Sequence, residues 1–174
     1  MRMWGAFRAL GWLGLAIILA LVASLGSSAT VQASSQWSWP LEAPHTVSRA
    51  FDRPAQNWLP GHRGVDLKAQ TGQPALAAGS GIVTFAGTLA GKGVVVINHG
   101  SFRTTYEPVQ PVVSVGDRVT RGQEIGTLAG GASHCASSIH VRCLHWGLRR
   151  GNEYLNPLLL ISGRIRLLPI GSSR

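Results

Sequence analysis

The sequence has few acidic residues, few cysteines and no sustained helical pattern. Only 7 of its 174 residues are Asp or Glu, against 16 Lys or Arg, so the formal net charge at pH 7 is +9. The arginines are scattered and form nothing like a nucleic-acid-binding module, so we expect no nucleic acid among its partners. A length of 174 residues favours one domain with a core of useful size.

Helical segments are scarce because prolines interrupt the candidate windows between residues 34 and 60. From Gly61 onwards, short apolar stretches alternate with turns that contain glycine, and the 22 glycines suit tight turns better than helices. Strands of this length and spacing predict an all-β fold with hairpins. One helical turn is expected in YLNPLLLI, beginning at Asn156 with Pro157 in its first turn.

The first 33 residues have the three parts of a secretory signal. Arg2 and Arg8 precede an uncharged apolar run from Ala9 to Gly26, and a VQA sequence ends at Ala33. We predict a signal peptide at residues 1–33. A retained membrane anchor is the alternative, because the run approaches the ~20 residues that span a bilayer. Either way we expect an exported, extracellular or envelope-associated protein, with a membrane as partner only if the segment is retained.

The rest of the chain divides into three expected parts. Residues 34–60 are expected to form a linker and a first strand, residues 61–161 the main β domain, and residues 162–174 a basic tail. With two arginines removed in the leader, 14 basic and 7 acidic residues remain. A basic exported protein is attracted to anionic envelope polymers, which we include among its expected partners.

The two cysteines, Cys135 and Cys143, are close in sequence. In an oxidising compartment this spacing predicts a local disulfide. Cys143 belongs to the stretch RCLHWGLR. If this stretch is a strand, alternate residues form one apolar face, and the opposite face presents Cys143 beside His145.

His62 and Asp66, in GHRGVDL, are four residues apart. In an extended segment these two positions face the same way, so both side chains could reach one ion. A histidine and a carboxylate, joined by a second histidine, form a hydrolytic zinc pattern that leaves one coordination position for water. A hydrogen-bonded His–Asp pair near a turn fits the same spacing, so this segment alone does not decide between the two.

The ordered motifs GHRGVDL, GIVTFAG, VGDRVTRGQEIG and LHWGLR resemble those of the lysostaphin-type zinc metallopeptidases, which cut peptidoglycan cross-bridges or stem peptides. The resemblance runs from about Trp39 to Leu160. It implies a single all-β domain of antiparallel sheets, barrel-sandwich-like (the duplicated hybrid motif), with zinc at the floor of an open groove. Mapped through the family's HxxxD and HxH motifs, it implies that Zn²⁺ is held by His62, Asp66 and His145, and that peptidoglycan or cell-wall peptide is the partner.

The turn-rich segment VSVGDRVTRGQEIG also looks like the repeat of lipoyl and biotinyl carrier domains. A carrier needs a lysine at a hairpin tip to hold its cofactor. Lys92, in AGKGV, lies at an expected turn and could meet that need, whereas export argues against a carrier.

The sequence departs from the metallopeptidase pattern at both of the family's assisting histidines. Cys143 stands at the first position of HxH, and Pro108 stands where the family has the histidine of its Tyr-x-His-Leu segment, which begins here at Tyr106. General acid–base assistance is commonly worth ~10² to 10⁴ in rate. A site without it would be slow or inert.

Three replacements for the missing base are open. Glu107 could act from the segment before Pro108, His134 or His140 could reach the site from the loop before the last long strand, or Cys143 could act itself. As a thiolate, Cys143 could instead be a fourth ligand that makes the zinc structural. Two functions follow: an exported zinc metalloendopeptidase acting on peptidoglycan cross-links, or a degenerate member that binds cell-wall peptide or activates a partner hydrolase.

Overall fold

A computed structural model of the chain describes residues 36–130, 135 and 142–162. The predicted signal segment, the predicted basic tail after Ser162, and the base candidates His134 and His140 therefore lie outside the described residues. Within the described ranges, no helix is long and apolar enough to cross a bilayer.

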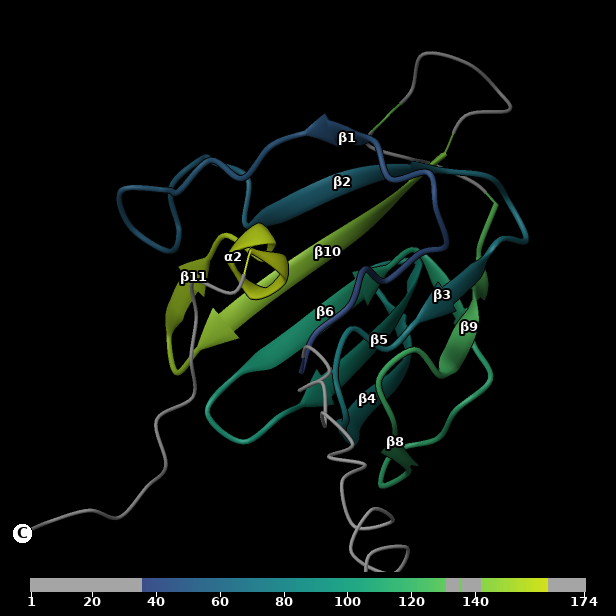
Figure 1. Cartoon of the computed structure of the whole chain (residues 1–174). Coiled ribbons are helices and arrows are strands. Elements are labelled where there is room, and N and C mark those ends of the chain that lie inside the picture. Colours follow the sequence, from purple (N-terminus) through teal and green to yellow (C-terminus); the bar gives the residue numbers. More distant parts are fainter. Residues whose placement is uncertain (1–35, 131–134, 136–141, 163–174) are drawn as a thin grey trace, which may run out of the picture. The chain divides into compact units, whose positions relative to one another are not determined.

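Two antiparallel sheets contain nearly all the regular structure (Figure 1), and neither sheet closes into a barrel, which confirms the predicted fold class. The larger sheet has the strand order β1-β2-β10-β6-β5-β4-β8, with β11 paired to β10, and the smaller has the order β3-β9-β7. The strands are β1 (Val47–Arg49), β2 (Gly64–Ala69), β3 (Pro74–Leu76), β4 (Gly81–Leu89), β5 (Lys92–Asn98), β6 (Arg103–Glu107), β7 (Val109–Pro111), β8 (Arg118–Val119), β9 (Glu124–Leu128), β10 (Arg142–Arg150) and β11 (Glu153–Leu155).

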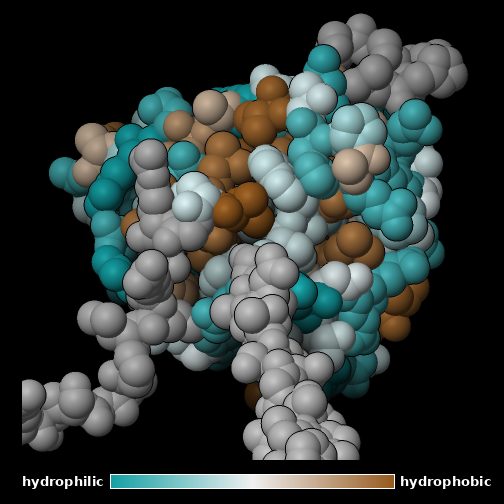
Figure 2. All heavy atoms as spheres, viewed as in Figure 1, coloured by the Kyte–Doolittle hydropathy of each residue, from teal (hydrophilic) through white to brown (hydrophobic). Residues whose placement is uncertain are grey.

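The core lies on one face of the large sheet, because apolar residues alternate along its strands. In β10, Leu144, Trp146 and Leu148 are buried, and in β2 so are Val65 and Leu67. Burying each such side chain stabilises the fold by roughly 1.5 to 3 kcal/mol. On the side of the molecule that Figure 2 shows, hydrophobic residues gather near the centre and hydrophilic ones toward the edges.

The segment 37–41, which the sequence places with the linker, packs against the core. Trp37 and Leu41 are 5% and 4% exposed. The Ser38 amide donates a hydrogen bond of 2.8 Å to the Ala78 carbonyl. No two-residue alternation marks this segment, so burial there depends on contacts with distant parts of the chain that a local pattern does not reveal.

Turns and the short helix α2 occur where glycine, proline and asparagine predict them. Gly116 and Gly122 have φ of 97° and 80°, a conformation that glycine adopts without steric cost, in the turns before β8 and β9. The helix α2 spans Leu158–Ile161, and the amide of Leu158, its first residue, donates a 3.0 Å hydrogen bond to Asn156 Oδ1. These turns shape the rim of the fold, whereas the large sheet positions the candidate site.

Candidate metal centre

Three polar residues form one row across the middle of the large sheet. Asp66 in β2 is opposite His145 in β10, and His145 is opposite Glu107 in β6. Residues directly opposite in an antiparallel ladder project to the same face. Because side chains alternate along a strand, this face is the reverse of the one on which Trp146 packs into the core.

His62 joins this row from the segment that precedes β2. An isolated bridge holds its backbone: the His62 amide donates to the Asp52 carbonyl at 2.7 Å, and the Asp52 amide donates back at 3.0 Å. The His62 Nδ1 donates to the Ala50 carbonyl at 2.7 Å. Since a carbonyl can only accept, Nδ1 carries a proton, and the Nε2 of the neutral ring is left as a lone-pair donor to a metal.

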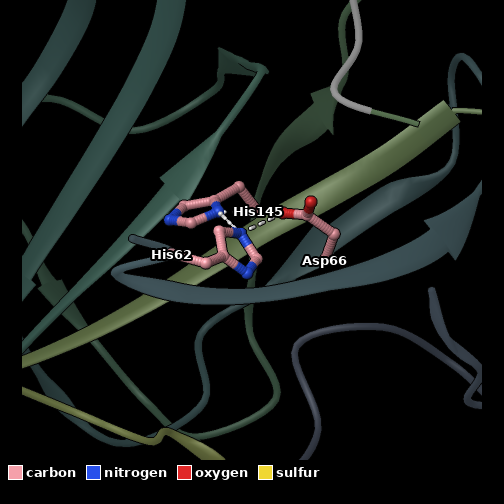
Figure 3. A group of neighbouring side chains, drawn as sticks. All are labelled: His62, Asp66 and His145. Atoms are coloured by element: carbon pink, nitrogen blue, oxygen red, sulfur yellow. Dashed lines mark hydrogen bonds and ion pairs between the residues drawn. The ribbon is translucent and has the colours of Figure 1, made fainter. Parts of the chain in front are cut away.

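The ligand atoms of His62, Asp66 and His145 converge on one point (Figure 3). His62 Nε2 lies 3.0 Å from Asp66 Oδ1 and 3.1 Å from His145 Nδ1, and the last two atoms are 2.9 Å apart. Ligands bound tetrahedrally to zinc at ~2.0 to 2.1 Å are about 3.3 Å from one another. The three atoms therefore need to separate by only a few tenths of an ångström, about 0.2 to 0.4 Å, to hold one ion.

The donor chemistry of the cluster also fits a cation. The side chains of His62, Asp66 and His145 are 4%, 0% and 14% exposed, so water does little to solvate their charges. A neutral His62 has no proton to offer toward Asp66, because its N–H is used by Ala50. Two imidazoles and one carboxylate with an open fourth position are the donor set of hydrolytic zinc sites.

Two glycines, opposite each other in β2 and β10, control the space around the His145 ring. A Cβ added to Gly64 would lie 2.7 Å from His145 Nε2, whereas one added to Gly147 would lie 3.8 Å from it and 3.6 Å from the Thr105 Cβ. Gly64 thus lets the β2 backbone approach the ring closely. Gly147 has no side chain, so the space beside the His145 ring stays open.

Cys143, beside the row, is joined to Cys135 by a disulfide with a Cα–Cα distance of 5.8 Å. The Ser48 hydroxyl lies 2.9 and 3.0 Å from the two sulfurs, and it donates to the Asp66 backbone carbonyl at 3.0 Å. A disulfide sulfur has no thiol proton and no thiolate charge. In this form Cys143 serves as neither a base nor a fourth ligand, and it ties residue 135 to β10.

Glu107 is the base candidate that lies within the described residues. It is half-buried at the end of β6 and, with His145, lines a pocket of about 210 Å³. Pro108, which follows it through a cis peptide bond, has no side-chain group that could carry a proton. The structure thus brings together the ligand atoms of His62, Asp66 and His145. Glu107 lies opposite His145 and lines the same pocket.

Three arginines line the same pocket, although they are scattered in the sequence: Arg63, Arg103 and Arg149. Their positions in the sequence did not mark them as site residues. A signal was present, because Arg103 lies four residues from Glu107 and Arg149 four residues from His145, and an even spacing along a strand keeps side chains on one face.

The row of Asp66, His145 and Glu107 is called the metal row below. The remaining described histidines, His45 and His99, lie outside it. His99 is hydrogen-bonded through Nδ1 to the Ser80 carbonyl at 2.8 Å and through Nε2 to Thr104 Oγ1 at 2.7 Å. Burial lowers the pKa of His99 from its ordinary value, and the Ser80 bond opposes this in part. His45 stacks on Trp39 with ring centroids 4.5 Å apart. Both contacts are structural.

Comparison with known proteins gives a family match that covers His62, Asp66 and His145. Residues 60–157 match the family model for Peptidase family M23. An uncharacterized protein of Mycobacterium tuberculosis (strain ATCC 25618 / H37Rv) is 47% identical over 154 residues, 85% of this chain and 61% of that protein. Peptidoglycan DD-endopeptidase ShyC of Vibrio cholerae serotype O1 is 32% identical over 100 residues, 56% of this chain and 23% of that protein.

Among solved structures, the antimicrobial peptidase lysostaphin from Staphylococcus simulans shares the fold, with a TM-score of 0.59 and 22% identity. The similarity covers 75% of this chain and 56% of that one. The chain therefore spans less than two thirds of the length of these relatives.

Proposed function

Because the chain belongs to peptidase family M23, we propose that it is an exported zinc metalloendopeptidase that hydrolyses the peptide cross-links of peptidoglycan. The convergence of the ligand atoms of His62, Asp66 and His145 beside a pocket carries this proposal. The similar protein of Vibrio cholerae, named a peptidoglycan DD-endopeptidase, supports the substrate class. Export rests on the signal-like character of residues 1–33.

In this proposal His62, Asp66 and His145 hold the metal. Zinc in such a site polarises an amide carbonyl and activates water at neutral pH. The chain's own residues orient the ligands: the Ala50 carbonyl fixes the tautomer of His62, and Gly64 leaves room for the His145 ring. Hydrogen bonds and packing around a metal-binding side chain hold it in place and tune its basicity.

Glu107 is the residue to which we assign proton transfer. It stands directly opposite His145, and it lines the pocket in which a substrate amide would lie. As general base it takes a proton from the attacking water, and as general acid it gives that proton to the leaving amine. His134 and His140 are the alternatives for this role.

A second function is favoured by the two substituted positions. Cys143 is held in a disulfide and Pro108 has no proton-carrying group, so both of the family's assisting imidazoles are absent from their usual places. A protein of this kind could keep zinc and pocket, and bind cell-wall peptide or activate a partner hydrolase without cleaving.

Mass spectrometry of peptides released from purified peptidoglycan separates the two functions. The zinc-loaded protein is compared with Asp66→Asn and with the control Asp117→Asn, in which an oxygen can still accept the turn hydrogen bond from the Ser114 amide. Release by the wild type and the control, but not by Asp66→Asn, supports the peptidase. Retention of the protein on insoluble peptidoglycan without release of peptides supports the binding function. If the protein neither releases peptides nor is retained, both functions are contradicted.

A further inference from the structure

The polar face of the large sheet continues beyond the metal row as two further rows. Next to the opposed pair His145 and Glu107 lie Gly147 and Thr105, and after them Arg149 and Arg103. With a rise of about 3.4 Å per residue, the arginine row lies about 14 Å along the strands from the metal row. Small residues fill the row between, and residues of both outer rows line one pocket of about 210 Å³.

Neutral partners hold two of the pocket's arginines in place. The guanidinium carbons of Arg63 and Arg149 lie 5.6 and 5.4 Å from the centroid of the Tyr154 ring, which is cation–π range. Arg149 Nη2 donates to Asn152 Oδ1 at 2.6 Å, and Arg63 Nη2 donates to the Leu59 carbonyl at 2.9 Å. These contacts orient the cations and leave their charge uncompensated.

The pocket carries excess positive charge at the end away from the metal row. Its three arginines face a single acid, Glu107, which lies at the metal end. The nearby acid Glu153 is paired instead with Arg53 at 2.9 Å and with Arg150 at 3.2 Å. Within the part of the chain that the structure describes, the arginines of the pocket make no ion pair of their own.

We propose that Arg103 and Arg149, flanked by Arg63, form an arginine subsite that selects peptides with a free carboxylate near the cleaved amide. The proposal rests on the proposed function, because the metal row fixes where that amide lies. A guanidinium matches a carboxylate in a bidentate geometry. An extended peptide advances at most about 3.3 to 3.6 Å per residue, so about four extended residues span the distance from the metal row to the arginine row.

The test uses one substrate in two forms. Cross-linked muropeptides, released from purified peptidoglycan by a muramidase, are used with free carboxylates and after conversion of those carboxylates to primary amides. Binding to the zinc-loaded protein is measured by calorimetry and cleavage by mass spectrometry; where cleavage is detected, kcat/KM replaces Kd. The variants are Arg103→Gln and the matched control Arg118→Gln, which removes one exposed strand arginine in β8.

The wild type and the control should favour the carboxylate form by about tenfold, and Arg103→Gln should lose most of that preference. If the wild type has the same Kd or kcat/KM for the two forms, or if Arg103→Gln keeps the preference, the subsite is overturned even if both forms are cleaved. A preference in binding without any cleavage supports the subsite and contradicts hydrolysis. Absence of both binding and cleavage overturns both.

Discussion

Replacing Gly64 with alanine should weaken the metal centre although no ligand is changed. The new Cβ would lie 2.7 Å from His145 Nε2 and closer still to the Trp146 carbonyl oxygen. Ordinary van der Waals contact begins at about 3.4 Å, so the ring must move by about 0.7 Å or the paired strands must separate. The ring is attached to β10, and the backbone oxygen cannot rotate away.

Overpacking of this kind costs about 1 to 3 kcal/mol, and displacing the surroundings of a metal ligand lowers metal affinity about 10- to 100-fold. We therefore expect Gly64→Ala to lower Tm by about 3 to 10 °C and to weaken zinc binding, measured by calorimetry and by competition with a chelator. Gly147→Ala is the matched control, because its Cβ would meet only contacts of 3.6 Å or more. Equal zinc affinities in the two variants would refute the reasoning.

Three further predictions concern the disulfide, His99 and Glu107. The disulfide closes a loop with a sequence separation of 8, so the double variant Cys135→Ser/Cys143→Ser should have a free energy of unfolding about 2.5 kcal/mol lower in chemical denaturation. It should keep its zinc, and loss of zinc would identify Cys143 as a ligand. Burial lowers the pKa of His99 below its ordinary 6.5, so the unfolded chain binds the proton more readily: the neutral ring's contribution is complete above about pH 6.5 and is lost as the pH falls below it. In the zinc-free protein, Tm should therefore fall less between pH 7.5 and 5 in His99→Gln than in the wild type, and parallel curves would contradict this. Glu107→Gln should reduce peptide release by about 10² to 10⁴ with zinc retained, whereas the exposed control Glu124→Gln should not; an active Glu107→Gln would move the base to His134 or His140.

The all-β class was predictable because alternation of apolar residues is a local property. In RCLHWGLR the sequence separates the face of Trp146 from the face of His145, and the structure shows this division. The family resemblance then pointed to His62 and Asp66 as partners of His145, and the structure places the three together. The resemblance was enough for this, because each of its motifs lies within one short segment.

The row of Glu107 beside His145 and the arginine row depend on the register between β6 and β10. These strands are far apart in the sequence, and their pairing is fixed by packing of the whole sheet, which no local pattern specifies. For the same reason Arg103 and Arg149 look unrelated in the sequence, yet they stand opposite each other in the fold. The tautomer of His62 likewise depends on a distant group, the Ala50 carbonyl.

X-ray absorption at the zinc edge tests the central claim most directly, because it reads the ligand shell of the ion itself. For the zinc-loaded protein we predict a shell of nitrogen and oxygen at about 2.0 to 2.1 Å that includes two imidazoles, with no sulfur at about 2.3 Å. The shell should be lost or altered in Asp66→Asn. A sulfur shell, or an unchanged spectrum in Asp66→Asn, would contradict the assignment of His62, Asp66 and His145 as the ligands of an open catalytic site.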